Sequence, residues 1–370
     1  MKRFLALFLA FIMLFSLVAC GGGTEEEEQE PVDVVATEIA LIIEGDKVEA
    51  DPYRNAIWEG IKIYGTINEL THKWYSVGSN ELEATKTTIM TAIEEGAQII
   101  IVGGSDFEEA VLSMAQEHTD INFVIIDGPG QTAEAESVMY ENVAQVIFKE
   151  EEAGYLAGYA AVMEGYRSLG FIGGRDVPSV KRYGYGFVQG AEAAAQELQL
   201  ESIDMKYHYL GHFDASPEVE AMAQSWYEEG VEVIFATAGA AGDSVMTAAE
   251  ILGKKVIGVD IDQSMESGTV ITSATKNLTE AVQTVLALYY HEHDQFPGNQ
   301  ILSMGILQRG VGLAMDTARM KNFTRDHYEV MIQEFLAAAT TEGAEQIVIL
   351  GDEVADVADI PVTIVTVNAE

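Results

Sequence analysis

The sequence is poor in cysteine, in basic residues and in long apolar runs, and each shortage narrows what the protein can do. Only 20 Lys and Arg stand against 60 Asp and Glu, a formal net charge of −40. This balance argues against a nucleic acid polymer as a partner, because phosphate contacts need clustered basic side chains. Cys20 is the single cysteine, so neither a disulfide scaffold nor a cysteine-ligated metal site is expected. After the N-terminus, no apolar run reaches the roughly 20 residues of a membrane span.

The N-terminus has the pattern of an export signal. Lys2 and Arg3 precede an apolar run over residues 4–17, and Cys20 follows small residues. This pattern directs cleavage before the cysteine, whose thiol then takes a lipid; an ordinary signal peptide with a chance cysteine is the alternative. We predict a signal peptide over residues 1–19, lipidation at Cys20 and placement at the outer, extracytoplasmic face of the cell membrane.

An acidic stretch follows the cysteine. Residues 25–28 are consecutive glutamates behind a glycine-rich start. Like charges repel one another and glycine is flexible, which predicts a tether over residues 20–37 rather than a folded element. The tether would hold a folded body away from the membrane, so the protein is expected to be anchored to the membrane and not to span it.

From residue 38 onward, short β-branched runs alternate with amphipathic helical patterns. Nearly continuous apolar runs, such as residues 99–102 and 123–126, are typical of parallel strands covered on both faces. Alternation of this length predicts an α/β fold with doubly wound, mostly parallel sheets flanked by helices. Two such series predict two lobes, whose ligands would bind beyond the carboxyl ends of the strands. We assign residues 38–150 and about 275–370 to lobe 1, and residues 151–274 to lobe 2.

Other segments are less regular. We expect a strand at residues 138–140 before a helix at residues 147–163. Near the C-terminus, we expect a helix at residues 325–342 and strands at residues 346–350 and 362–367.

Groups of residues at the predicted strand ends occur in an order that is typical of one family. They are Glu141-Asn142-Val143 with residues 151–158, residues 170–174 with Pro178-Ser179-Val180, Gly211-His212-Phe213-Asp214, Ala238-Gly239, residues 257–263, and Thr272-Ser273 with Lys276. This order resembles the basic membrane protein family, the PnrA-like substrate-binding lipoproteins of ABC transporters, many of which bind purine nucleosides. The resemblance runs from about Trp58 to Gly312.

The resemblance implies a two-lobe periplasmic binding protein type I fold that closes around a small ligand by hinge motion. It implies a nucleoside, purine ones first, as the ligand, and ABC permease and ATPase subunits as partners. It implies neither a cofactor nor a resident metal, and we expect a monomer.

The segment before the first helix departs from the family pattern. Counting back from Trp58, Tyr53 and Arg54 stand where the family usually has Phe and Asn. An aromatic platform therefore survives, whereas the amide that would read the base does not. An arginine there could meet a carbonyl-rich base or an acidic group, so a sugar or a furanose-type signal is an alternative ligand.

The candidate ligand residues supply the two kinds of contact that a nucleoside needs. A carboxylate accepts two ribose hydroxyls more strongly than a neutral acceptor does, and Asp260 stands at a predicted strand end, with Lys276 able to bridge it to the ribose. A flat base stacks on aromatic rings, and glycine-rich turns let backbone amides approach a ligand. A core aromatic, a helix cap or a tight turn is the competing interpretation at each position. The further candidates are Tyr53, Tyr183, Phe213, Ser105, Phe107 and Gly239; Asp127 is left outside the ligand contacts.

Catalytic and metal-binding patterns are weak. Gly103-Gly104-Ser105 lacks the glycine after the serine that a nucleophile elbow needs. In His291-Glu292-His293-Asp294 the two imidazoles point to different faces of a helix. No Walker or dinucleotide-binding motif appears. We therefore predict a binding protein rather than an enzyme; a surface sensor and a nucleoside hydrolase remain as alternatives.

Overall fold

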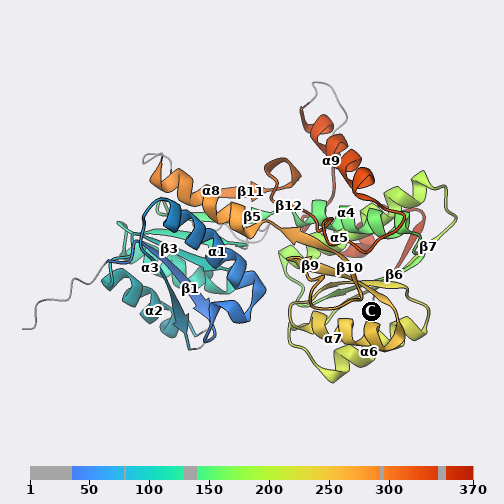
Figure 1. Ribbon diagram of the computed structural model, residues 1–370, viewed down its shortest axis with the longest axis horizontal. Helices are drawn as coiled ribbons and strands as arrows, with labels where there is room; N and C mark the ends of the chain where they lie inside the picture. The colour runs from blue at the N-terminus through green and yellow to red at the C-terminus, as the bar shows by residue number, and fades with distance from the viewer. Residues whose placement is uncertain (1–35, 79–80, 129–139, 292–295, 341–346, 370) are drawn as a thin grey trace, which may run out of the picture. The chain divides into compact units, whose positions relative to one another are not determined.

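Two sheets flanked by helices form the body of the protein (Figure 1). The computed structural model describes residues 36–78, 81–128, 140–291, 296–340 and 347–369. The predicted lipidation site, Cys20, and residues 292–294 of the histidine-containing motif lie outside the described residues. Among the residues that are described, no helix is both long and apolar enough to cross a bilayer.

The first sheet is parallel and has the strand order β11-β5-β4-β3-β1-β2. Strand β1 shows why it is covered twice: Ile39 and Leu41 pack in the cluster formed with α1 and α8, whereas Ala40 and Ile42 pack with α2 and α3. This alternation follows from the two-residue period of a strand. The strands are β1 (Ile39–Glu44), β2 (His72–Val77), β3 (Ile99–Gly103), β4 (Asn122–Ile126), β5 (Val143–Phe148) and β11 (Gln300–Met304). The helices are α1 (Pro52–Ile67), α2 (Leu82–Glu94), α3 (Glu108–Glu117) and α8 (Leu278–Tyr290).

The second sheet has the order β12-β10-β9-β8-β6-β7-β13, with β12 antiparallel to β10 and the other pairs parallel. Phe171 packs toward α4 and α5, and its neighbour Ile172 toward α6 and α7. The strands are β6 (Ser168–Gly173), β7 (Ile203–Tyr209), β8 (Val233–Thr237), β9 (Lys255–Asp260), β10 (Val270–Lys276), β12 (Val311–Leu313) and β13 (Val365–Ala369). The helices are α4 (Glu150–Glu164), α5 (Pro178–Glu197), α6 (Pro217–Glu228), α7 (Ala241–Leu252) and α9 (Arg325–Thr340). The prediction of an α/β fold with two mostly parallel sheets is confirmed.

The strand before α4 lies later in the sequence than predicted. Of the strand predicted at residues 138–140, residues 138 and 139 lie outside the described residues and residue 140 is not in a strand; β5 is Val143–Phe148. The side-chain amide of Asn142 donates to the backbone carbonyls of Ala115, His118 and Ile121 at 3.1, 3.0 and 2.9 Å. These bonds fix the start of β5 against the end of α3, and α4 begins only at Glu150.

The C-terminal segment also differs from its prediction. Residues 347–350 are not a strand. The side-chain amide of Gln189 instead donates to the Leu350 carbonyl at 2.8 Å and accepts from the Leu350 amide at 2.9 Å. β13 begins at Val365, because the carboxylate of Glu192 accepts from the amides of Thr363, Ile364 and Val365, each at 2.9 Å.

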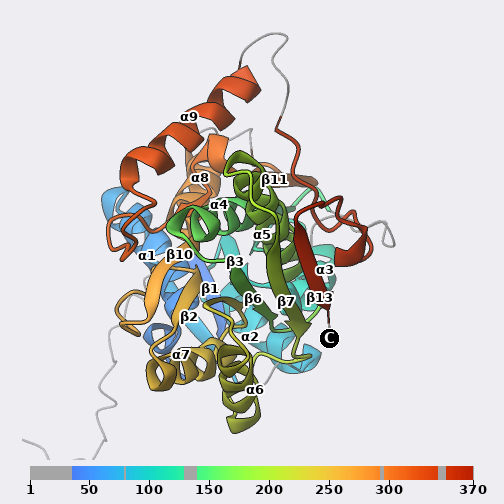
Figure 2. The ribbon, with the colours of Figure 1, turned by 90° about the vertical axis from the view of Figure 1, so that its right-hand side faces the viewer.

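The return of the chain after residue 275 divides between the two sheets. β11 joins the first sheet, as expected for lobe 1, whereas β12 and β13 join the second. Figure 2 shows β13 alongside β7 at the edge of that sheet. Assigning all of residues 275–370 to lobe 1 is therefore wrong for these two strands. β12 pairs with β10 at one edge of the second sheet, and β13 pairs with β7 at the other. The other predicted domain boundaries stay predictions.

Candidate ligand-binding site

Strand ends from both sheets meet at one cavity of about 330 Å³. The ends of β3 and β4 contribute from the first sheet, and the ends of β8, β9 and β10 from the second. All the predicted ligand residues except Arg54 line this cavity: Tyr53, Ser105, Phe107, Tyr183, Phe213, Gly239, Asp260 and Lys276. A larger groove lies along α9, lined mainly by α9 side chains and the residues around β12; of the predicted ligand residues, only Lys276 lines it.

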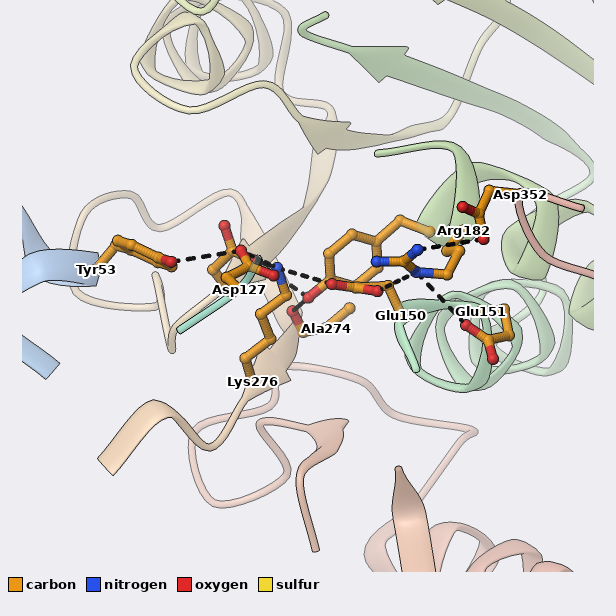
Figure 3. Close-up of polar contacts among 10 residues, drawn as sticks. Tyr53, Asp127, Glu150, Glu151, Arg182, Ala274, Lys276 and Asp352 are labelled. Atoms are coloured by element: carbon orange, nitrogen blue, oxygen red, sulfur yellow. Dashed lines mark hydrogen bonds and ion pairs between the residues drawn. The ribbon is translucent and has the colours of Figure 1, made fainter. Parts of the chain in front are cut away.

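Lys276 lies at the centre of a cluster of carboxylates (Figure 3). Its Nζ is 2.7 Å from Asp127 Oδ2, 3.0 Å from Glu150 Oε1 and 3.3 Å from Asp260 Oδ1. Burial alone lowers the pKa of this lysine, but the three carboxylates raise it well above its usual value. The ammonium group is therefore charged, as a buried lysine is when opposite charges compensate its desolvation.

Asp260 is the carboxylate of this cluster that a ligand can reach most easily. Its side chain is 30% exposed, against 13% for Asp127 and none for Glu150. Its Oδ1 accepts from the Tyr183 hydroxyl at 3.2 Å. Asp260 also has a backbone φ of +63°, which is rare for a residue with a side chain and turns the end of β9 toward the cavity.

Asp127, which the sequence analysis left outside the ligand contacts, also lines the cavity. Its Oδ2 accepts from Lys276 and, at 3.4 Å, from the Tyr53 hydroxyl. Its Oδ1 is buried without a hydrogen-bond partner among the described residues. Burial raises the pKa of Asp127 to about 6, although Lys276 lowers it. Its φ of +59° is close to that of Asp260. Two aspartates at strand ends thus share a positive φ, which no sequence pattern predicted.

The aromatic candidates differ in what they offer a ligand. The Tyr183 ring is 2% exposed and packs edge-on against Phe235, so its geometry favours hydrogen bonding through the hydroxyl over the predicted stacking. Phe213 lies under the guanidinium of Arg175, 5.0 Å from the ring centroid. A Cβ at Gly174 would lie 2.1 Å from Phe213 Cδ1, so a glycine is needed beneath this ring.

The loop after β3 carries the remaining lobe 1 candidates. Ser105 and Phe107 form a short 3-10 turn before α3. The ring of Phe107 is 7% exposed and packs in the apolar cluster of α2 and α3, so it lies in the cavity wall rather than projecting into it. Gly104 has a φ of +95°, which turns the loop between β3 and this wall and suits glycine.

Arg54 is the predicted ligand residue that the structure keeps out of the cavity. Asp51 caps α1 by accepting from the Arg54 amide at 3.1 Å. The Arg54 guanidinium turns back to the carbonyl of Glu44 and pairs with the Asp51 carboxylate at 3.5 Å. It lines a neighbouring hollow instead, because a residue in the first turn of α1 points back toward the loop that precedes the helix.

Metal-binding geometry is not found in the part of the chain that the structure describes: no group of His, Cys, Asp and Glu there could hold an ion. The cavity instead offers hydroxyl-accepting carboxylates, one buried ammonium and aromatic surface.

Comparisons with known structures agree with this architecture. A solute-binding protein of an ABC transporter from Aeropyrum pernix matches with a TM-score of 0.63 at 20% identity, covering 81% of this chain and 85% of that one. One from Conexibacter woesei matches with a TM-score of 0.64 at 20% identity, covering 82% and 97%. The fold is that of the type I periplasmic binding proteins.

Sequence comparisons give the family. The nucleoside-binding protein BmpA of an ABC transporter from Lactococcus lactis is 25% identical over 86% of this chain and 92% of its own length. Basic membrane protein B of Borreliella afzelii is 30% identical over 68% of this chain and 72% of its own length. The family model described as ABC transporter substrate-binding protein PnrA-like matches residues 36–338. The chain belongs to this Bmp family of ABC transporter substrate-binding proteins.

Proposed function

We propose that the protein captures a nucleoside, purine ones first, in the cavity at the strand ends and delivers it to the permease of an ABC importer. The observation that carries the ligand class is the pair formed by Asp260 and Lys276. A partly exposed carboxylate beside a charged ammonium suits a ribose diol, because the carboxylate accepts both hydroxyl hydrogens and the ammonium donates to a hydroxyl oxygen. The name of the Lactococcus lactis relative, a nucleoside-binding protein, supports the same ligand.

The walls of the cavity suit the base. Phe213 and Tyr53 offer aromatic surface, and stacking a base on such a ring is worth about 1–3 kcal/mol. The cavity volume of about 330 Å³ lies at the lower end of the roughly 300–1,000 Å³ typical of small-molecule sites. Arg54 lies in the neighbouring hollow, which weakens the sequence-based reason for a sugar or furanose-type ligand.

Delivery would take place at a membrane. We propose that a lipid at Cys20 anchors the protein at the outer face of the cell membrane, and that residues 20–37 let the body reach a permease in the same membrane. The family membership supports a transporter as the partner.

A thermal-shift and calorimetry panel tests the ligand class. Inosine, guanosine and adenosine are compared with free bases, ribose and a pentulose. A ligand at a thousand times its dissociation constant stabilises the native state by about 4 kcal/mol, so a purine nucleoside should raise the melting temperature clearly. If all three nucleosides leave the transition unmoved, the ligand assignment fails; a response to the pentulose or ribose alone selects the alternative.

A further inference from the structure

A row of buried ion pairs connects the cavity to the C-terminal segment (Figure 3). Lys276 Nζ lies 3.0 Å from Glu150 Oε1, and Glu150 Oε2 accepts from Arg182 Nε at 2.5 Å. Arg182 Nη1 lies 3.2 Å from Asp352 Oδ1. Glu150 and Arg182 are thus each shared between two neighbours, and the row runs from β10 through α4 and α5 to a residue that follows α9.

The far end of this row is held in place by the fold. Gln189 on α5 binds both backbone groups of Leu350, two residues before Asp352. The Glu192 carboxylate accepts from the amides of Ile364 and Val365 at the start of β13, and β13 itself pairs with β7 along its length. The match to the family model ends at residue 338. Asp352 is therefore a fixed residue of a segment that lies outside that match.

The charges along the row depend on one another. Glu150 is fully buried between two cations; burial alone raises the pKa of its carboxyl, but Arg182 and Lys276 bring it below its usual value. A buried charge must be compensated by its neighbours, and removing one partner changes the demand on the others. Asp352, whose side chain is 25% exposed, compensates part of the charge of Arg182. Arg182 also lies 4.0 Å from Glu151.

Removing the charge of Asp352 changes the relative strength of the two ion pairs that Glu150 forms, one with Arg182 and one with Lys276. Arg182 then draws Glu150 more strongly, so Glu150 holds Lys276 less. Lys276 moves closer to Asp127 and Asp260. Its ammonium then contacts the Asp260 carboxylate, which faces the cavity, more closely. A ligand hydroxyl then competes with the ammonium for the same acceptor.

We propose that Asp352 is a positioning residue for Lys276: acting through Arg182 and Glu150, the segment after α9 sets the ligand affinity of a cavity that it does not touch. The affinity effect rests on the proposed function, whereas the effect on Lys276 itself does not.

The test compares Asp352→Asn with a matched control and a rescue in the full chain. Asp359→Asn removes the same charge from an exposed position in the same segment, and Asp352→Glu keeps the charge. The first readout is the nitrogen NMR signal of the Lys276 ammonium, assigned by its loss in Lys276→Met. The second is the affinity for inosine.

Asp352→Asn should move the Lys276 signal and weaken inosine binding by about 2- to 30-fold, the range typical of residues that modulate a site without contacting its ligand. Asp359→Asn should change neither quantity, and Asp352→Glu should restore most of the affinity. A Lys276 signal that is the same in wild type and in folded Asp352→Asn overturns the proposal.

Failure of the proposed function and failure of Asp352→Asn to fold can each be distinguished from failure of the Asp352 proposal. If wild type binds none of the nucleosides, the proposed function fails, and the Lys276 signal still decides the present proposal. If Asp352→Asn does not fold, Arg182→Lys is measured instead, because lysine keeps the charge but lacks the forked nitrogens that contact Glu150 and Asp352 separately. An unmoved Lys276 signal in that variant is equally decisive against the proposal.

Discussion

The Lys276 ammonium lies 2.7 Å from the Asp127 carboxylate, although 149 positions separate the two residues in the chain. Asp127 follows β4 of the first sheet, and Lys276 ends β10 of the second. One ion pair thus joins the two sheets directly beside the cavity. A ligand that binds there contacts groups whose charges are already shared between the sheets.

Replacing Asp260 tests the ribose assignment. Asp260→Asn removes the charge of the carboxylate that faces the cavity while keeping its shape, and a hydrogen bond to a charged group is worth about 1.5–3 kcal/mol. We expect inosine affinity measured by calorimetry to fall by roughly 10- to 100-fold. Asp204→Asn, exposed on β7, is the matched control and should bind like wild type. Unchanged binding by Asp260→Asn would remove this residue from the site.

Asp127 predicts a pH dependence of stability. Burial raises its pKa from 3.8 to about 6 in the folded protein, so between these values the folded state holds a proton that the unfolded state has lost. The free energy of unfolding contributed by this group therefore falls as pH rises from about 4 to about 6, by roughly 3 kcal/mol in total.

Denaturant unfolding from pH 4 to pH 8 checks this sign. Asp127→Asn cannot titrate, so its stability relative to wild type should increase across the same interval and then level off. Asp204→Asn provides the control for a general effect of pH. A difference between Asp127→Asn and wild type that stays constant with pH, or falls, contradicts the prediction.

The sequence predicted the fold and the residues at strand ends better than it predicted the directions of their side chains. The apolar runs of β3 and β9 placed Ser105 and Asp260 each at the carboxyl end of a parallel strand, where ligands of such sheets bind. Arg54 was misplaced, since its direction depends on how Asp51 caps α1. The contact between Asp127 and Lys276 was missed, because no local pattern says which strand ends of two separate sheets will meet.

The charge of the cavity predicts discrimination against phosphorylated ligands. Its lining includes five carboxylates and two cations, and one of these cations, Arg175, is paired with Asp106 at 3.2 Å. Like charges placed together at a binding site cost several kcal/mol. Inosine monophosphate should therefore bind at least roughly tenfold more weakly than inosine in calorimetry at moderate salt. Equal or tighter binding of the nucleotide would show that a cation is free to take the phosphate. The lining carboxylates are Glu44, Asp51, Asp106, Asp127 and Asp260, and the cations are Arg175 and Lys276.

Lipid attachment at Cys20 predicts a change of location. Cys20→Ser should abolish palmitate labelling and release the protein from the membrane fraction, because a hydroxyl does not accept the lipid that the thiol does. Thr24→Ser, in the predicted tether, is the control and should remain labelled. Labelled Cys20→Ser would place the anchor elsewhere.

The glycine beneath Phe213 predicts a specific loss of base binding. A Cβ at Gly174 would meet Phe213 Cδ1 at 2.1 Å and the His212 carbonyl at 3.1 Å, so in Gly174→Ala the ring must shift away from residue 174. Such overpacking costs about 1–3 kcal/mol of stability, and the displaced ring can no longer stack on a base in the same plane.

Gly242→Ala provides the matched substitution, because nothing lies within 4 Å of the added Cβ and alanine favours the helix α7 by roughly 0.5–1 kcal/mol. Calorimetry should show weaker binding of inosine and guanosine to Gly174→Ala, and wild-type binding to Gly242→Ala. Because a shift of Phe213 affects the base and not the ribose contacts at Asp260, the loss should be larger for purine nucleosides than for any residual binding of free ribose. An equal loss for both ligands would mean that Phe213 supports the whole cavity rather than the base.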